Sequence, residues 1–268
     1  MLVPRGLKRW VDAGLQRRGY HLLPRWRLNR YSQSTHIAGL FRMLGVDCVL
    51  DVGANIGQYH EFLRLHVGYT GEVVSLEPID EMYQGLVGAS RADPLWQVHR
   101  LALGEADRSM TIHVTRERTL SSLLPRDEAE LRRMGYQKYL KETELDTTEQ
   151  VTVRRLDGVL PEIVPRRDAR IFMKCDTQGY DMNVVRGAAA CLGDLLAIQV
   201  ELSVRHVYSG STPYLDAIAE LTSLGYELTG IFPVQRDSSL RVVNVDCVMV
   251  RKDAVEQMRQ TAPRAGTN

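Results

Sequence analysis

The chain has 268 residues, which is enough for one large α/β domain or two small ones. Hydrophobic residues make up 44% of it and charged residues 25%, as is typical of a soluble globular protein. The formal net charge of +1 gives no global argument for a nucleic-acid or membrane partner, and no apolar stretch approaches the roughly 20 residues of a membrane helix.

The first part of the chain is basic and is predicted to be helical. Residues 1–42 hold nine Lys and Arg residues against a single acid, Asp12. The spacing of apolar residues predicts helices over 7–20 and 36–46. We expect residues 1–45 to form an N-terminal helical extension, with its basic face either solvated or in contact with an anionic partner. Because charges interrupt its apolar runs, the segment does not fit a secretory signal, and we expect a cytoplasmic protein.

From residue 46 onward, predicted strands and helices alternate along the chain. This alternation predicts an α/β fold, in which a mostly parallel sheet carries helices on both faces. The last two strands follow each other closely, so we expect an antiparallel hairpin at one edge of the sheet. The expected strands are 48–53, 71–78, 95–104, 109–116, 151–156, 170–176, 195–203, 226–234 and 242–251, and the expected helices are 57–67, 80–90, 180–193 and 212–225, with a further helix opening at Asp157.

The stretch 117–150 is the least regular part of this pattern, with one charged helix between loops. An insertion of this length inside a domain is often a lid or a binding segment, and the alternative is a solvated surface helix. Ser121 and Ser122 lie near its start. We predict that they contact a bound cofactor or close over it, the alternative being a surface turn.

A glycine-rich turn, DVGANIG, follows the first predicted strand over 51–57. A triphosphate-binding loop needs a lysine and then Ser or Thr after its last glycine, whereas Gln58 and Tyr59 stand there. A dinucleotide-binding turn needs three glycines in the pattern G-x-G-x-x-G, whereas position 55 is asparagine. The sequence therefore disfavours both kinds of phosphate site.

The turn fits S-adenosylmethionine better than a phosphate-bearing cofactor. Glycines allow close approach of the main chain to its methionine part, and its amine and sulfonium charges favour a nearby carboxylate such as Asp51. Glu77 ends the next strand, and its two oxygens can accept hydrogen bonds from both ribose hydroxyls. The cofactor-binding residues that we expect are Asp51, Gly53, Asn55, Gly57, Glu77, Ser121 and Ser122.

Five segments occur in an order that is typical of one known family: VLDVGANIGQY, VVSLEP, IFMKCDTQGYDMNVVRGA, IQVELS and NVDCVMV. Together they resemble the FkbM family of S-adenosylmethionine-dependent methyltransferases, over about residues 46–251. The third segment is the most specific. Lys174, Asp176 and Gly179 match its family pattern, whereas Gln178 and Asp181 stand where glutamate is usual.

The resemblance implies a Rossmann-like class I methyltransferase fold over 46–252, with a mostly parallel seven-stranded sheet, followed by a flexible tail at 253–268. It also implies O-methylation with S-adenosylhomocysteine as the product. By the same resemblance we expect the acceptor to be a hydroxyl of a saccharide, either a small molecule or an oligosaccharide, in the assembly of a bacterial polysaccharide or glycolipid. A homodimer is left open.

Methyl transfer to a hydroxyl needs a group that takes its proton. Ligands of open α/β sheets lie beyond the carboxyl ends of the strands, and Asp176 and Glu201 end two predicted strands. We predict that they act as base and hydroxyl anchor, with Lys174 on the same strand face as Asp176 and His206 as an alternative base. Asp176 and Glu201 also leave Mg²⁺ open as a second cofactor.

Other functions stay open on the sequence alone. The acceptor could be a hydroxyl or amine of a polyketide or peptide, and the chain could bind the cofactor without chemistry. A nucleic-acid methyltransferase finds little support, because no acceptor motif of the N-P-P-Y type is present, and we expect no nucleic-acid partner. The four cysteines form no CxxC pair or metal-finger spacing, so we expect reduced core residues at Cys48, Cys175, Cys191 and Cys247.

Overall fold

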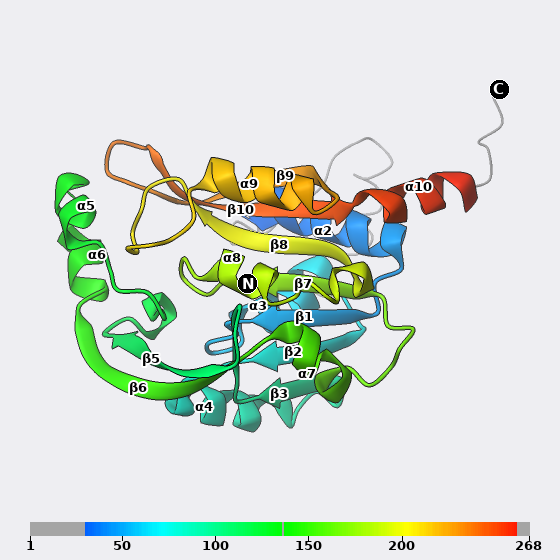
Figure 1. Cartoon of the computed structure of the whole chain (residues 1–268), viewed down its shortest axis with the longest axis horizontal. Helices are drawn as coiled ribbons and strands as arrows, with labels where there is room; N and C mark the ends of the chain where they lie inside the picture. Colours follow the sequence, from blue (N-terminus) through cyan, green and yellow to red (C-terminus); the bar gives the residue numbers. More distant parts are fainter. Residues whose placement is uncertain (1–29, 136, 262–268) are drawn as a thin grey trace, which may run out of the picture.

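The centre of the fold is a seven-stranded sheet with the strand order β3-β2-β1-β7-β8-β10-β9. The computed structural model describes residues 30–135 and 137–261, so the helix predicted over 7–20 lies outside the described residues (Figure 1). Five strands run parallel, and β10 is antiparallel to both of its neighbours. The strands are β1 (Cys48–Val52), β2 (Glu72–Leu76), β3 (Trp96–His99), β7 (Ile171–Cys175), β8 (Leu195–Ser203), β9 (Tyr226–Arg236) and β10 (Val242–Arg251).

The central strands are buried on both faces, as parallel strands usually are. Every residue of β1 and β7 is buried. Side chains alternate between the faces, so Val49 packs under helices on one side and Leu50 under helices on the other. The helices that contribute to these two cores are α2 (Tyr31–Leu44), α3 (Gln58–Phe62), α4 (Asp80–Ser90) and α10 (Lys252–Thr261) on the first face, and α7 (Leu156–Ile163), α8 (Asp181–Arg186) and α9 (Tyr214–Ser223) on the second.

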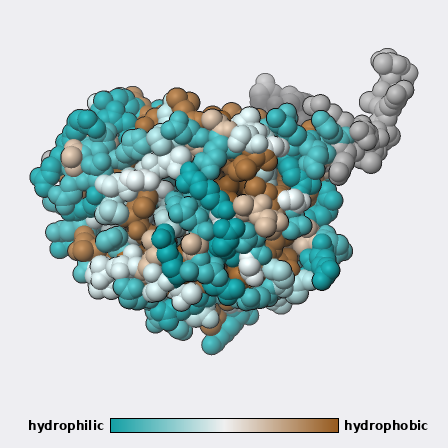
Figure 2. Space-filling view, viewed as in Figure 1, coloured by the Kyte–Doolittle hydropathy of each residue, from teal (hydrophilic) through white to brown (hydrophobic). Residues whose placement is uncertain are grey.

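This arrangement confirms the predicted α/β fold, including the antiparallel hairpin of β9 and β10 at one sheet edge (Figure 1). The four cysteines are free and buried, as predicted. The face of the molecule in Figure 2 is mostly hydrophilic, with hydrophobic side chains in scattered groups. Among the described helices, none has the length and apolar character needed to cross a membrane.

Two predicted elements belong to a second, three-stranded sheet instead of the main one, with the order β4-β6-β5. The strand predicted over 95–104 is divided, because the chain leaves the main sheet after β3 and pairs again as β4 (Ala102–Leu103). The neighbouring strands are β5 (Arg108–Thr115) and β6 (Leu145–Arg154). β6 begins six residues before the predicted start at Val151, since its first half is exposed and lacks the apolar pattern of a strand.

The predicted irregular insertion is therefore partly regular. It contains a turn of 3-10 helix at Arg118–Leu120, two short helices, α5 (Glu128–Arg133) and α6 (Gln137–Glu142), and the start of β6. Where one charged helix was expected, the break between α5 and α6 follows Gly135, whose φ of +65° lies in the left-handed region. The small hydrophobic cluster of Leu131, Met134 and Tyr139 with Val207 and Tyr208 anchors both helices.

The ends of two predicted elements were wrong. A flexible tail was expected from residue 253, but the chain continues as α10, because Ala254 and Val255 pack into the core beside α2. The helix expected over 180–193 ends at Arg186. There the chain passes so close to the loop after β4 that a Cβ on Gly187 would lie 1.9 Å from the carbonyl oxygen of Gly104. The remaining helical segments are a π-helical turn, Leu63–Val67, which completes the predicted helix 57–67, and a 3-10 turn at Leu192–Asp194.

Candidate active site

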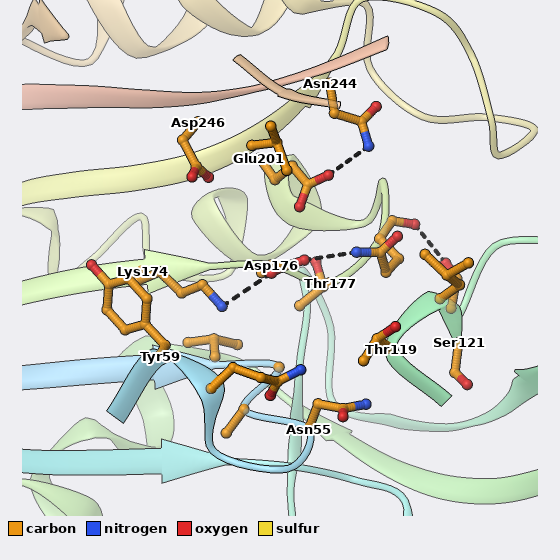
Figure 3. Close-up of a pocket in the computed structure, with 18 of the residues that line it drawn as sticks. Asn55, Tyr59, Thr119, Ser121, Lys174, Asp176, Thr177, Glu201, Asn244 and Asp246 are labelled. Carbon is orange, nitrogen blue, oxygen red and sulfur yellow. Dashed lines mark hydrogen bonds and ion pairs between the residues drawn. The ribbon is translucent and has the colours of Figure 1, made fainter. Parts of the chain in front are cut away.

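A cavity of about 940 Å³ opens beyond the carboxyl ends of β1, β2, β7 and β8, where open α/β sheets bind their ligands (Figure 3). β10 runs in the opposite direction, so it contributes residues near its start. Figure 3 shows Lys174 between Tyr59 and Asp176, with Glu201 and Asp246 on one side of them. The wall is completed by the turn after β1, the residues after β2, the 3-10 turn of the insertion and the end of β9.

The glycine turn is required by the close approach of two strand ends. Gly53 has a φ of +79°, and a Cβ there would lie 2.1 Å from the carbonyl oxygen of Asp176. Gly53 and Asn55 line the cavity, whereas Gly57 does not. At Gly57 the φ is +90° and a Cβ would lie 2.9 Å from the indole ring of Trp96, so this glycine allows α3 to pack on the sheet.

Glu77 is fixed by the main chain around it. Its carboxylate accepts hydrogen bonds from the backbone N–H groups of Asn55 at 2.8 Å and Ile79 at 2.9 Å. The side chain is only 3% exposed, and burial raises the pKa of Glu77 to about 7 against the lowering effect of these donors. Because Glu77 lines the cavity and each oxygen has one main-chain donor, each keeps a lone pair for a ligand hydroxyl.

Asp51 does not line the cavity, contrary to what its expected contact with the cofactor requires. It is fully buried behind the wall, where it accepts a hydrogen bond from Ser75 Oγ at 3.1 Å and lies 3.4 Å from Lys174 Nζ. Ser75 accepts in turn from Trp96 Nε1 at 3.0 Å. Asp51 therefore positions Lys174 from the buried side of the cavity wall.

Lys174 is the buried cation at the centre of the site. Its Nζ lies 3.4 Å from Asp51 and 3.3 Å from Asp176, and 5.1 Å from the centre of the Tyr59 ring. Burial alone would lower the pKa of Lys174, but the carboxylates of Asp176 and Asp51 raise it above its ordinary value. Lys174 therefore remains charged although its side chain is only 7% exposed.

Asp176 and Glu201 differ in protonation although they are neighbours. Burial alone would raise the pKa of the Asp176 carboxyl. Lys174 and hydrogen bonds from its neighbours lower this pKa by a larger amount, so the net shift is downward and Asp176 is ionised. Burial and the charge of Asp176 raise the pKa of Glu201 well above its ordinary value, so Glu201 holds a proton. Asn244 Nδ2 donates to Glu201 Oε1 at 2.5 Å, which fixes this side chain against β10. The site thus presents one ionised and one protonated carboxyl.

The two departures from the family pattern have distinct local roles. Gln178 Nε2 donates to Asp176 Oδ1 at 2.8 Å, and Tyr208 donates to Gln178 Oε1 at 3.0 Å. A glutamate at 178 could not donate to Asp176 when ionised. Asp181 is buried below the turn and accepts the backbone N–H groups of Thr177 and Gly179 at 3.3 and 3.2 Å. The shorter side chain of Asp181 therefore supports the main chain without reaching the cavity.

The remaining predicted residues are divided between the site and its surroundings. Ser121 and Ser122 line the cavity, and Ser122 Oγ donates to the carbonyl oxygen of Gln178 at 2.8 Å. His206 does not line it; its Nδ1 lies 3.3 Å from Ser211 Oγ, and this contact turns the ring toward the neighbouring loop. The structure thus provides no geometric support for His206 as a base.

Several lining residues were not predicted from the sequence. Gln199 pairs with Lys174 across the strands and accepts a hydrogen bond from the Tyr59 hydroxyl at 2.9 Å. Asp246 stands opposite Glu201 and accepts from Gln33 Nε2 at 2.7 Å. The available signal was polar residues at every second position of two apolar strands, which places them on one face. Further polar lining residues that were not predicted include Gln33, Tyr139 and Asn244.

The described residues include no cluster of three or more His, Cys, Asp or Glu side chains that could hold a metal ion. Within the part of the chain that the structure describes, Asn55 Oδ1, Thr177 Oγ1 and Asn244 Oδ1 at the cavity have no hydrogen-bond partner, and they suit hydrogen bonds from an organic ligand. The site therefore fits a polar cofactor with hydroxyl groups better than a bound cation.

Known proteins place the chain in a family. The Methyltransferase FkbM domain matches residues 51–228. No curated protein matches the chain significantly. Among solved structures, a methyltransferase FkbM from Methylobacillus flagellatus KT is 19% identical with a TM-score of 0.46, and the match covers 76% of this chain and 43% of that one. The chain thus spans less than half of that protein.

Two further structures carry S-adenosylmethionine. The fibrillarin of Aeropyrum pernix is 12% identical with a TM-score of 0.45, and covers 83% of this chain and 76% of its own. The magnesium protoporphyrin IX methyltransferase of Synechocystis PCC 6803 is 9% identical with a TM-score of 0.43, and covers 92% and 91%. Family membership rests on the domain match over two thirds of the sequence. The chain belongs to the FkbM methyltransferase family.

Proposed function

We propose that the protein transfers a methyl group from S-adenosylmethionine to a hydroxyl of a saccharide. The observation that carries this proposal is the contrast within one cavity. At one end Glu77 offers two oriented oxygens, and at the other Asp176, Glu201 and Asn244 form a polar surface. Closely spaced hydrogen-bonding groups suit a polyhydroxylated acceptor better than an apolar one.

The cofactor end is assigned to residues around β1 and β2. Glu77 would hold the ribose hydroxyls, and Gly53 would let the main chain approach the methionine part. Asn55, Ser121 and Ser122 would complete the contacts. When bound, S-adenosylmethionine supplies an electrophilic methyl group next to the carboxyl pair.

The reaction needs the acceptor hydroxyl to lose its proton as the new O–C bond forms and the C–S bond breaks, with the bonding electrons passing to sulfur. Asp176 is the base in this proposal, because it is the ionised member of the pair and its side chain is 32% exposed. The protonated Glu201, which hydrogen-bonds Asp176 in the ligand-free protein, would donate to the acceptor in its place and orient it. Lys174 is a positioning residue that keeps Asp176 ionised.

The experiment that tests the function is a radioactive methyl-transfer screen of monosaccharides and oligosaccharides, with polyketide and peptide acceptors in the same plate. We expect transfer to a saccharide hydroxyl, identified by mass spectrometry of the product. Transfer to a polyketide or peptide alone would replace the saccharide assignment. Binding of S-adenosylhomocysteine without transfer to any acceptor would indicate a cofactor-binding protein that is not a catalyst.

Mg²⁺ dependence is tested separately by assaying the enzyme in EDTA. The negative charge of Asp176 is balanced by its ion pair with Lys174, and no cluster of three metal ligands occurs among the described residues. We therefore expect EDTA to leave the rate unchanged. A rate that falls in EDTA and returns with Mg²⁺ would assign a metal to Asp176 and Glu201. The four free cysteines support our proposal of a cytoplasmic location.

A further inference from the structure

The outer wall of the cavity carries two arginines that the proposed chemistry does not use. Arg30 immediately precedes α2 and Arg236 ends β9, and both line the cavity. α2 and β9 pack against each other, since His36 Nε2 lies 3.1 Å from Thr229 Oγ1 and the His36 ring lies 5.5 Å from that of Phe232. This contact holds the two arginine-bearing ends at the same rim.

Neither arginine is neutralised by a carboxylate among the residues that the structure describes. Arg236 Nη1 donates to the carbonyl oxygen of Leu240 at 3.0 Å, which leaves most of its donors unused. The guanidinium carbon of Arg30 lies 5.8 Å from the centre of the Phe62 ring. Both side chains belong to exposed residues, so their charges face the solvent at the entrance.

A third arginine of the wall, Arg118, makes the contrast clear. Its guanidinium is paired with Glu81 at 3.2 Å and with Asp146 at 2.8 Å. Arg118 is thus held by the protein itself, on the side of the cavity formed by the insertion. The charge available to a ligand is therefore concentrated at Arg30 and Arg236.

Between this rim and the carboxyl pair lies a buried polar atom that has no partner among the described residues. Asn244 is 4% exposed, and its Nδ2 donates to Glu201 while its Oδ1 accepts no hydrogen bond from residues 30–135 or 137–261. Asn244 pairs with Gln235, the residue before Arg236, across the β9–β10 hairpin. An unpaired buried acceptor is costly, so a ligand hydroxyl that donates to Asn244 would bind favourably.

We propose that the acceptor is an anionic saccharide, whose phosphate or carboxylate group is bound by Arg30 and Arg236. Its reacting hydroxyl lies at Asp176 and Glu201, and a second hydroxyl donates to Asn244. The guanidinium fork suits both anions, because each presents paired oxygens that accept two N–H groups. A basic rim also raises the rate at which an anionic acceptor enters. This inference rests on the proposed saccharide O-methyltransferase function.

The test uses matched forms of glucose, mannose and galactose: the neutral methyl glycoside, the uronic acid, the 1-phosphate and the nucleoside diphosphate. The double variant Arg30→Gln/Arg236→Gln is compared with the wild type and with Arg42→Gln. Arg42 is an exposed residue of α2 that does not line the cavity. The measured quantity is kcat/KM for each acceptor, together with KM for S-adenosylmethionine.

We expect the wild type to prefer one anionic form to the methyl glycoside by at least about tenfold. The double variant should lose about tenfold or more in kcat/KM for that form only, with an unchanged KM for S-adenosylmethionine. Arg42→Gln should behave as the wild type. The uronic acid and the two phosphate forms show which anion the rim binds. Binding of S-adenosylhomocysteine by calorimetry confirms that the variants are folded.

Three results would overturn the inference, and they are distinguishable. Equal use of neutral and anionic sugars would leave the saccharide function standing and remove the role of the arginines. Transfer to none of the sugars would remove both proposals. A loss in the double variant that is the same for every acceptor and appears in KM for S-adenosylmethionine would assign the arginines to the cofactor carboxylate instead.

Discussion

The two ends of the cavity are built in different ways. At the cofactor end the main chain forms the site: Gly53 allows two strand ends to approach, and Glu77 is held by the N–H groups of Asn55 and Ile79. At the acceptor end side chains from distant parts of the sequence form the site, as in the pair of Glu201 and Asn244. The first end depends on main-chain geometry, which most side-chain substitutions leave in place. The second can change by substitution, so it is the end at which acceptor specificity is expected to vary.

If this contrast holds, changes at the two ends affect different kinetic quantities. The largest effect is expected for Asp176→Asn, which keeps the shape of the side chain and removes the base. We expect kcat to fall about 10²- to 10⁴-fold with little change in the dissociation constant of S-adenosylhomocysteine. Rapid-quench or steady-state methyl transfer and calorimetry measure the two quantities.

The matched control is Asp168→Asn, an exposed aspartate outside the cavity, which should leave kcat unchanged. A folded Asp176→Asn enzyme that keeps near-wild-type kcat would show that Asp176 is not the base. An Asp176→Asn enzyme that loses affinity for S-adenosylhomocysteine instead would contradict the assignment of the two cavity ends to cofactor and acceptor.

Gly53→Ala tests the cofactor end. The added methyl group would lie 2.1 Å from the carbonyl oxygen of Asp176 in a left-handed backbone, so the turn must shift. We expect the free energy of unfolding to fall by about 2–4 kcal/mol and S-adenosylhomocysteine to bind at least about 30-fold more weakly. Gly85→Ala is the control, because Gly85 is an exposed helical residue with no atom within 4 Å of an added Cβ. It should stabilise the protein by up to about 1 kcal/mol. Wild-type affinity in Gly53→Ala would mean that the turn is free to move.

The same difference explains what the sequence could predict. The cofactor end depends on local patterns, a glycine turn after one apolar strand and a carboxylate after the next, and both Gly53 and Glu77 line the cavity. The sequence pattern could not distinguish Gly53, which lines the cavity, from Gly57, which faces Trp96. Both positions adopt a positive φ, so both favour glycine whether or not they contact a ligand. The sequence pattern also could not show that Asp51 lies behind the cavity wall. A polar residue in an apolar strand gives the same pattern whether its side chain faces the cavity or the protein interior.

The acceptor end could be predicted only in part. Asp176 and Glu201 were found because the apolar pattern shows both strands clearly, and Asp176 directly follows β7 while Glu201 lies near the end of β8. Asp246 and Gln199 needed the strand register, which requires the pairing order of the sheet. The elements of the fold can be divided in the same way into those that a local sequence pattern predicts and those that depend on their neighbours. Buried strands such as β1 and β7 were predicted closely, whereas the exposed start of β6 and the charged α10 lack an apolar pattern and depend on their neighbours.

Glu77→Gln is expected to have a smaller effect than Gly53→Ala, because the main chain at the cofactor end stays in place. In our proposal the Glu77 carboxylate accepts hydrogen bonds from two ribose hydroxyls, so removing its charge should weaken S-adenosylhomocysteine binding about tenfold. In the wild type, hydroxyl donors favour the ionised carboxylate. With the pKa of free Glu77 raised to about 7, binding should therefore tighten as the pH rises from 6 to 8, and this dependence should be reduced in the variant. A binding curve that is flat in the wild type would contradict the role of Glu77.

The stability of the ligand-free protein gives an independent check on Glu77. Its pKa is raised from 4.5 in the unfolded chain to about 7, so the folded protein binds the proton more tightly. The free energy of unfolding must then fall as the pH rises between these values. Asp181 and Asp246, whose pKa values are raised to about 7 and about 6, act in the same direction. Glu77→Gln should therefore reduce the slope of stability against pH without abolishing it.

The smallest effect is expected for Gln178→Glu, which introduces the residue usual in the family and sharpens the account of the acceptor end. The substitution removes the hydrogen bond that Gln178 donates to Asp176 and places a second carboxyl beside it. Both changes raise the pKa of Asp176, so a larger fraction of the base is protonated at the acidic end of the pH range. We expect the acidic limb of the pH–rate profile to move to higher pH, with kcat about threefold to tenfold lower on that limb and little changed at pH 7. Gln84→Glu, on the exposed face of α4, should leave the profile unchanged. An unchanged limb in Gln178→Glu would mean that the ionisation of Asp176 is set by Lys174 alone, and that the acceptor end tolerates either residue at 178.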